Sequence, residues 1–271
     1  MPRRPHWTLA DIPWDAIDRT AIVGDQRLFY LVAAASFIEI TTESYTRNLA
    51  IFCADEPEVV DWLENGWLRE EMQHGVALRR YVETVWPEFD WECAYRGFMS
   101  EYAELCAIDH YAPGRALEMA ARCVVETGTS SFYRMLADAS PEPVLSKLAA
   151  LISADEIDHY KHFYRYFRLY AERERPGRWA VMRTLLARVA EVDAEDAAIA
   201  FKYVRLQSQP GVPYSKAEFK KFRRDIRPWA ARYYRFDRAV RMLLKPMALP
   251  GTLSRLAVQV GIGLARAILF A

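Results

Sequence analysis

The feature that most constrains this chain is an internal repeat. Residues 39–49 read EITTESYTRNL and residues 126–136 read ETGTSSFYRML, with Glu, Thr, Ser, Arg and Leu at matching positions. Farther along, REEMQHGVALRRY (69–81) overlays ADEIDHYKHFYRY (154–166), at nearly the same offset. Two helical hairpins of similar design, joined by a crossover, are predicted to form a four-helix bundle.

The rest of the chain also reads as helix, because Pro and Gly separate long stretches that show no period-two alternation. The fold class is therefore predicted to be all-α, with extra C-terminal helices. Residues 1–24 form an N-terminal segment, residues 25–207 the bundle with its flanking helices, and residues 208–271 a basic and apolar helical extension of the same domain. Helices are expected near 25–53, 57–86, 95–110, 113–139, 143–174, 177–207, 215–244 and 251–270.

Each predicted hairpin offers one Glu on its first helix and a Glu-x-x-His motif on its second. Residues three apart lie on one face of a helix, so the Glu and the His of each motif point the same way. Each Glu lies equally far from its hairpin turn, 14 residues in the first hairpin and 13 in the second, so the carboxylates meet at one level. The candidate metal ligands are Glu39, Glu71, His74, Glu126, Glu156 and His159.

Four carboxylates and two imidazoles in an apolar bundle would be costly to bury without cations. Two divalent ions remove that cost, and this ligand set is that of ferritin-like di-iron or di-manganese proteins. Carboxylate-rich ligation favours iron over structural zinc. Glu43 competes with Glu39 because one turn separates them, but the overlay pairs Glu39 with Glu126 and Glu43 with Ser130. We therefore favour Glu39 and regard Glu43 as a neighbouring carboxylate.

Glu70 and Asp155 directly precede the two Glu-x-x-His motifs. A metal-bound His usually donates its other N–H to a carboxylate. We predict that each bonds the His of the opposite hairpin, Asp155 with His74 and Glu70 with His159. The alternative is simple solvation at the edge of the bundle.

The remaining candidates carry weaker signals. Trp7 or Trp14 could end an electron path, although a tryptophan near an N-terminus more often packs. His162 is interpreted as an ordinary polar residue, and His6 and His110 have no motif around them.

The segments EEMQHG (70–75) and ADEIDH (154–159), with Glu126 followed three residues later by Thr129, resemble the acyl-carrier-protein desaturase branch of the ferritin-like superfamily. The resemblance covers roughly residues 25–175. It implies that the six candidate ligands hold two iron ions, Fe/Fe rather than Mn/Fe, and that Thr129 is a hydroxyl on the oxygen-binding side. The alternative for Thr129 is a hydrogen bond back to its own helix.

The expected function is that of an O₂-dependent di-iron oxidoreductase, of desaturase or hydroxylase type, acting on a fatty-acyl or similar apolar substrate. Electrons would come from an external donor such as a ferredoxin. The alternatives are a hydroxylase or N-oxygenase of another substrate, such as a modified tRNA base, and a non-catalytic ferroxidase-type protein. Leu78, one turn beyond His74, disfavours a radical-storing reductase subunit, which would want a tyrosine there. A peroxidase of rubrerythrin type would want the Cys pairs that are missing.

The charge is unevenly distributed. Lys+Arg and Asp+Glu are equal at 36 each, yet residues 202–271 carry 15 basic and 3 acidic residues. This part of the chain could dock an acidic acyl carrier protein, a tRNA or an anionic membrane surface, or be a solvated basic face. Without a Cys-x-x-Cys pair or a secretory signal, we expect a cytoplasmic protein, peripheral on a membrane if the apolar tail lies on one, and a homodimer.

Overall fold

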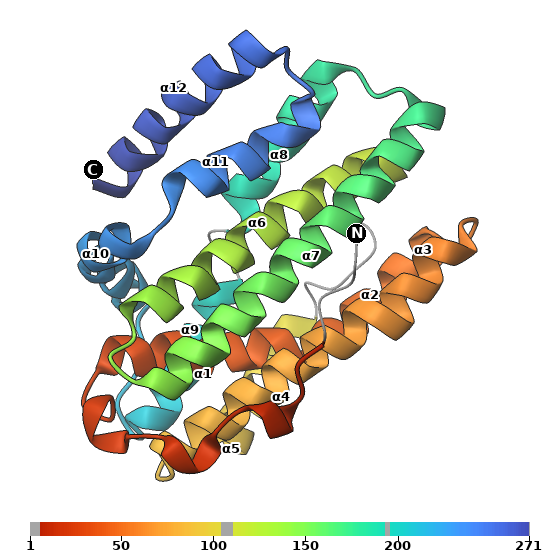
Figure 1. Cartoon of the computed structure of the whole chain (residues 1–271). Helices are drawn as coiled ribbons and strands as arrows, with labels where there is room; N and C mark the ends of the chain where they lie inside the picture. The colour runs from red at the N-terminus through yellow and green to blue at the C-terminus, as the bar shows by residue number, and fades with distance from the viewer. Residues whose placement is uncertain (1–5, 104–110, 193–195, 271) are drawn as a thin grey trace.

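The computed structural model describes residues 6–103, 111–192 and 196–270. All the regular secondary structure in these residues is helical, with helices α1 to α12, and the predicted all-α class is confirmed (Figure 1). Residues 104–110, with Cys106 and His110, lie outside the described residues.

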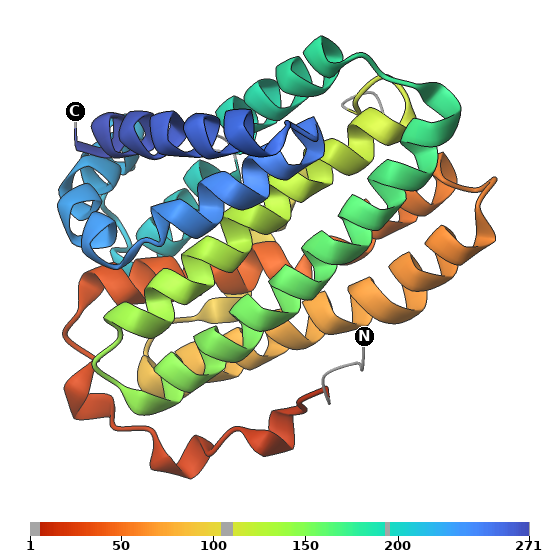
Figure 2. The same cartoon turned by 45° about the horizontal axis from the view of Figure 1, so that its top comes forward.

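The centre of the molecule is two antiparallel hairpins (Figures 1 and 2). The first consists of α1 (Gln26–Ile40) and α2 (Thr42–Phe52), followed by α3 (Pro57–Trp62), the π-helical turn η4 (Leu63–Trp67) and α4 (Leu68–Val85). The second consists of α6 (Arg115–Ala139) and α7 (Pro143–Glu174). The second begins its return helix with Pro143 in the first turn and with the Glu142 side chain accepting hydrogen bonds from two backbone amides. Proline fits there because the first-turn amides have no partner within the helix.

The first hairpin is less regular than the sequence predicts. The prediction of one continuous helix over 25–53 and another over 57–86 is wrong, because each stretch is interrupted. The chain breaks between α1 and α2 at Thr41, whose hydroxyl bonds the Ile38 carbonyl at 2.5 Å, and it widens into the π-helical turn before α4. Both irregularities lie within one or two turns of a candidate ligand. A hydroxyl that bonds back to its helix, or a π-helical turn, commonly bends a helix at such places.

The other helices cover the bundle. α5 (Trp91–Tyr102) and α9 (Asp196–Ser208) pack on each other and α9 packs on α1, while α8 (Arg178–Val192), α10 (Lys216–Tyr233) and α11 (Phe236–Leu244) pack on α6. The short turn η7 (Lys245–Met247) leads to α12 (Gly251–Phe270), which lies on α11 and α10 as the outermost layer (Figure 2). The helix expected over 215–244 is two helices instead, α10 and α11. The helix expected over 177–207 corresponds to α8 and α9, and residues 193–195 between them lie outside the described residues.

The bundle interior is apolar at both ends and polar in the middle. One apolar cluster contains Phe37, Tyr81 and Ile152, and the other contains Leu49, Cys123 and Phe163. Along α6 and α7 the candidate ligands fall between these two clusters. Burial of the apolar ends therefore fixes the helices whose middle turns carry the charged residues.

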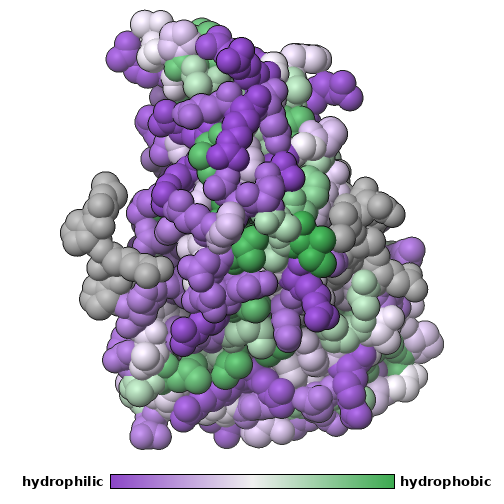
Figure 3. Space-filling view, turned by 90° about the vertical axis from the view of Figure 1, so that its right-hand side faces the viewer, coloured by the Kyte–Doolittle hydropathy of each residue, from purple (hydrophilic) through white to green (hydrophobic). Residues whose placement is uncertain are grey.

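Residues 6–24 of the N-terminal segment form a strap of short 3-10 turns along α4 and α7, and this strap is red in Figures 1 and 2. The Trp14 ring lies against the Arg80 guanidinium, and Lys147 donates a hydrogen bond to the Asp11 carbonyl at 2.7 Å. The face drawn in Figure 3 is mostly hydrophilic, with hydrophobic groups in small areas. In the part of the chain that is described, no helix combines the length and apolarity needed to cross a bilayer.

Candidate metal centre

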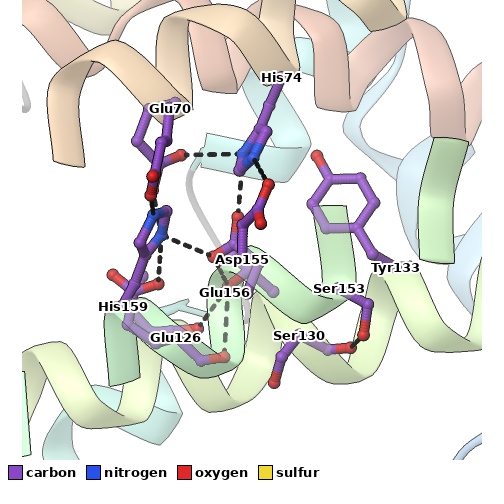
Figure 4. A network of polar contacts seen from close by, with 12 residues as sticks. Glu70, His74, Glu126, Ser130, Tyr133, Ser153, Asp155, Glu156 and His159 are labelled. Atoms are coloured by element: carbon purple, nitrogen blue, oxygen red, sulfur yellow. Dashed lines mark hydrogen bonds and ion pairs between the residues drawn. The ribbon is translucent and has the colours of Figure 1, made fainter. Parts of the chain in front are cut away.

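The six candidate ligands meet in the middle of the bundle. They come from α1, α4, α6 and α7, and each is at most 5% exposed. Figure 4 shows the contacts across the gap between the hairpins, with His74 of α4 extending toward Asp155 and Glu156 of α7, and His159 of α7 extending toward Glu70 of α4. The repeat therefore brings together side chains up to 120 residues apart, as its register predicts. Glu43, the competitor of Glu39, is exposed and lies outside the cluster.

The ligand atoms form two overlapping groups of four. One group contains Glu39, Glu71, His74 and Glu156, the other contains Glu71, Glu126, Glu156 and His159, and within each group the atoms lie within 4.8 Å of one another. A metal with ligands at about 2.1 Å keeps neighbouring ligand atoms about 3 Å apart and opposite ones about 4 Å apart. The group dimensions match a single ion in each, and Glu71 and Glu156 would contact both ions.

Each histidine faces the carboxylates of its own group through the same ring nitrogen, Nδ1. His74 Nδ1 lies 3.2 Å from Glu156 and 3.8 Å from Glu39 and from Glu71. His159 Nδ1 lies 3.1 Å from Glu71, 3.7 Å from Glu126 and 3.8 Å from Glu156. Neither Nδ1 has a hydrogen-bond partner, and the same holds for one oxygen of Glu126 and one of Glu156. Buried polar atoms are rarely left without a partner, so these four atoms fit a cation.

The protonation of the cluster also fits a cation. Burial raises the pKa of Glu39 and Glu126 far above the usual value, and the nearby carboxylates add to this effect. Burial acts in the same direction on Glu156, but the neighbouring imidazoles of His159 and His74 outweigh it and hold its pKa at about 2. Burial would lower the pKa of His74 and His159, yet the surrounding carboxylates raise both. Protons thus neutralise the ion-free cluster, and divalent ions would displace them.

The two predicted hydrogen bonds between the hairpins are present. His74 Nε2 lies 3.1 Å from Asp155 Oδ2, and His159 Nε2 lies 2.7 Å from Glu70 Oε2. Because each carboxylate needs a donor, it fixes the proton on Nε2 and leaves Nδ1 free to accept a metal.

The N-terminal strap contacts Asp155 and Glu70, the two outer carboxylates that bond the ligand histidines. Trp7 Nε1 donates to Asp155 at 2.5 Å, and its indole stacks on His74 with ring centroids 6.1 Å apart. His6 Nδ1 lies 2.6 Å from Glu70 Oε1. Sequence reasoning left Trp7 open between packing and an electron path, and it gave His6 no role. No motif could have found these contacts, because the strap reaches the site only through the tertiary fold.

Two hydroxyls contact the ligand carboxylates from α6. Thr129 Oγ1 donates to Glu156 Oε2 at 2.6 Å, whereas its own helix carbonyls are 3.3 Å away, so the contact with the site is the shorter one. Tyr133, which is 1% exposed, donates a hydrogen bond to Glu39 Oε1. Sequence reasoning missed Tyr133. Its position seven residues after Glu126, on the same face of the helix, was the available signal.

On the side of α3, aromatic rings cover the second group of ligand atoms. The Trp62 ring lies edge-on to His159 and stacks on His162 at a centroid distance of 4.7 Å. His162 is therefore part of this aromatic wall and not an isolated polar residue.

Comparison of the chain with protein-family models, with curated proteins and with solved structures gave no match. The interpretation of the site therefore depends on its geometry and on the chemistry of its residues.

Proposed function

We propose that this chain is a ferritin-like dimetal carboxylate protein that holds two iron ions between its hairpins. The observation that carries the proposal is that Glu71 and Glu156, at equivalent positions of the repeat, belong to both groups of ligand atoms. Glu39 and His74 would complete the ligand set of one ion, and Glu126 and His159 would complete that of the other. Carboxylate-rich sites with one imidazole per metal suit redox-active iron.

The reaction proposed for the site is the O₂-dependent oxidation of an apolar organic substrate, with a fatty-acyl chain as the substrate class. Two irons would supply the oxygen reduction, and the protein positions the substrate and excludes water. Asp155 and Glu70 orient the two imidazoles, and the hydroxyl of Thr129 holds a proton beside Glu156. The chain of contacts from Trp7 through Asp155 to His74 offers electrons from an external donor, such as a ferredoxin, a route to the first ion.

Metal content tests the proposal. Protein prepared without oxygen and reconstituted with Fe(II) should hold about two irons per chain. Glu71→Ala should lose both ions together, because this residue belongs to both groups, while Glu39→Ala should mainly lose one. Glu43→Ala is the matched control, since it removes an exposed carboxylate one turn from Glu39. Zero or one iron in the unmodified protein, or two irons in Glu71→Ala, would contradict the dimetal assignment.

The basic C-terminal region favours a second candidate, in which the substrate is carried by an anionic macromolecule such as an acyl carrier protein or a tRNA. The alternative from another class is a ferroxidase-type metal-binding protein that does not act on an organic substrate. Oxygen uptake separates the classes. An oxidase consumes O₂ when its organic substrate is added, whereas a ferroxidase consumes it in proportion to added Fe(II).

A further inference from the structure

The exposed aliphatic side chains of the described residues are concentrated on two outer helices. Seven of the eleven large hydrophobic residues that are exposed lie on α8 or α12. Four of them form one stripe along α12, at intervals of three or four residues: Leu253, Leu256, Val260 and Leu264, which are 48–61% exposed. Such a stripe on the outermost helix of the molecule indicates an interaction surface.

The orientation of α12 is fixed by its other face. Val258 is 4% exposed, and Gly261 lies so close to α11 that an added Cβ would meet Val240 at 2.7 Å. The helix therefore packs on the body through one apolar face while it presents a second one outward. An apolar stripe that is already held in a helix needs no folding step before it binds.

The charges around the stripe select an anionic partner. Arg255 and Arg266 are exposed, and their eleven-residue spacing places them on the same side of α12, about a quarter turn from Leu256 at the edge of the stripe. The Arg266 guanidinium also lies over the Phe236 ring of α11. Residues 238–270 contain five basic residues and no acidic one. In the described part of the chain, neither arginine forms an ion pair with a carboxylate.

We propose that α12 is an interfacial helix that binds the protein to anionic lipid membranes. Leu253, Leu256, Val260 and Leu264 would enter the boundary between headgroups and acyl chains, with Arg255 and Arg266 among the lipid phosphates. This combination of an apolar stripe and flanking arginines is what helices lying in the membrane plane use. The proposal depends on the outer helix alone and not on the metal centre.

A second copy of the chain is a poorer occupant of the same stripe. An antiparallel pair of α12 helices centred near Val260 would place Arg255 of one copy opposite Arg266 of the other. This arrangement brings like charges together beside an apolar contact, which disfavours it. A parallel pair would place the arginines of the two copies on opposite edges of the contact. Neither arrangement gives the basic residues of 238–270 an anionic partner, because this stretch contains no acidic residue.

The test is co-sedimentation of the full chain with vesicles of phosphatidylcholine alone and of phosphatidylcholine with about 30 mol% phosphatidylglycerol. The protein should sediment with the anionic vesicles and stay mostly in solution with the neutral ones. Leu256→Ser/Leu264→Ser should weaken binding about a hundredfold, because two exposed leucines lose their apolar contact. Ile51→Ser/Val76→Ser is the matched control, since it removes two exposed aliphatic residues from α2 and α4.

A second pair of variants separates the electrostatic part. Arg255→Gln/Arg266→Gln should lower binding to anionic vesicles about tenfold and leave the weak binding to neutral vesicles unchanged. Equal sedimentation of Leu256→Ser/Leu264→Ser and its control would overturn the proposal. A chain that binds neither kind of vesicle would also overturn it. In that case, a dimer seen by light scattering and abolished by Leu256→Ser/Leu264→Ser would assign the stripe to a second copy of the chain.

Discussion

Tyr133 on α6 donates its phenolic hydrogen bond to the carboxylate of Glu39 on α1, so the two hairpins share a buried contact beside the first group of ligands. The tyrosine ring is anchored in the apolar cluster at one end of the bundle. The hydroxyl holds one oxygen of Glu39 in place and leaves the other facing His74. The aromatic core thereby sets the orientation of a proposed ligand.

Tyr133→Phe should weaken the first metal position about tenfold, because Glu39 loses its orienting donor, and leave the second position nearly unchanged. A chelator competition with Co(II) measures both affinities. Tyr81→Phe is the control, since that buried tyrosine also donates to a carboxylate, at 2.8 Å to Glu142, but outside the site. Equal losses of metal affinity in the two variants would show that Tyr133 acts only through stability.

The two outer carboxylates should act on different ions. Asp155→Asn removes the negative charge that faces His74 Nε2 and should weaken the first position about 10- to 100-fold, whereas Glu70→Gln should weaken the second by a similar factor. The visible spectrum of the Co(II) form, taken as each ion is added, reports which position has changed. Asp158→Asn provides a control on the same helix as Asp155, because Asp158 pairs with exposed Lys161. Identical spectra for Asp155→Asn and Glu70→Gln would contradict the reciprocal pairing.

Gly75 allows α4 to approach α1 closely beside Glu39. An added Cβ there would meet the Ile40 side chain at 2.4 Å and its backbone nitrogen at 2.8 Å. Gly75→Ala should lower the free energy of unfolding by about 1–3 kcal/mol, since the backbone of α1 must move. Gly128→Ala, where nothing lies within 4 Å, should be neutral or stabilising by up to about 1 kcal/mol. Urea unfolding measures both, and similar losses in the two variants would refute the close approach.

Glu118 on α6 contributes a pH-dependent part of the stability. Burial would raise its pKa, but the Arg122 charge, the Ala112 amide and the Arg188 charge outweigh it and hold the pKa below the usual 4.5. A lowered pKa in the folded state stabilises the protein above the pKa of the unfolded chain, and this contribution is lost as the pH falls through the folded value. Glu118→Gln should therefore cost about 3 kcal/mol at pH 7, and the cost should shrink below pH 4.5.

Urea unfolding of both proteins at pH 7 and at about pH 4 measures this change. Glu58→Gln is the control, because its partner Arg165 and Glu58 itself are both more than half exposed, and it should cost well under about 1 kcal/mol. A difference between wild type and Glu118→Gln that grows toward acid pH would show the sign to be wrong.

The sequence alone predicted the helical class, the extent of α7 and the meeting of the six candidate ligands, because all three follow from the repeat and from helix periodicity. It did not predict the break at Thr41 or the π-helical turn, since these depend on how the first hairpin packs around its charged middle. The contacts of His6 and Trp7 with the site could not be predicted either, because the tertiary fold brings these residues to it.

The exchange of partners between the hairpins has a consequence for the two proposed metal positions. His74 takes its carboxylate from α7 and His159 takes its carboxylate from α4, so each half of the chain completes the other, as two copies do across an isologous interface. The repeat thus starts the two positions as equivalent. The two positions differ in contacts that the repeat does not share. Tyr133 at Glu39 and Trp7 at Asp155 lie beside the first position, and the Trp62 ring and His6 at Glu70 lie beside the second. Any difference between the two proposed metal positions in order of filling or in potential would originate in such unrepeated contacts.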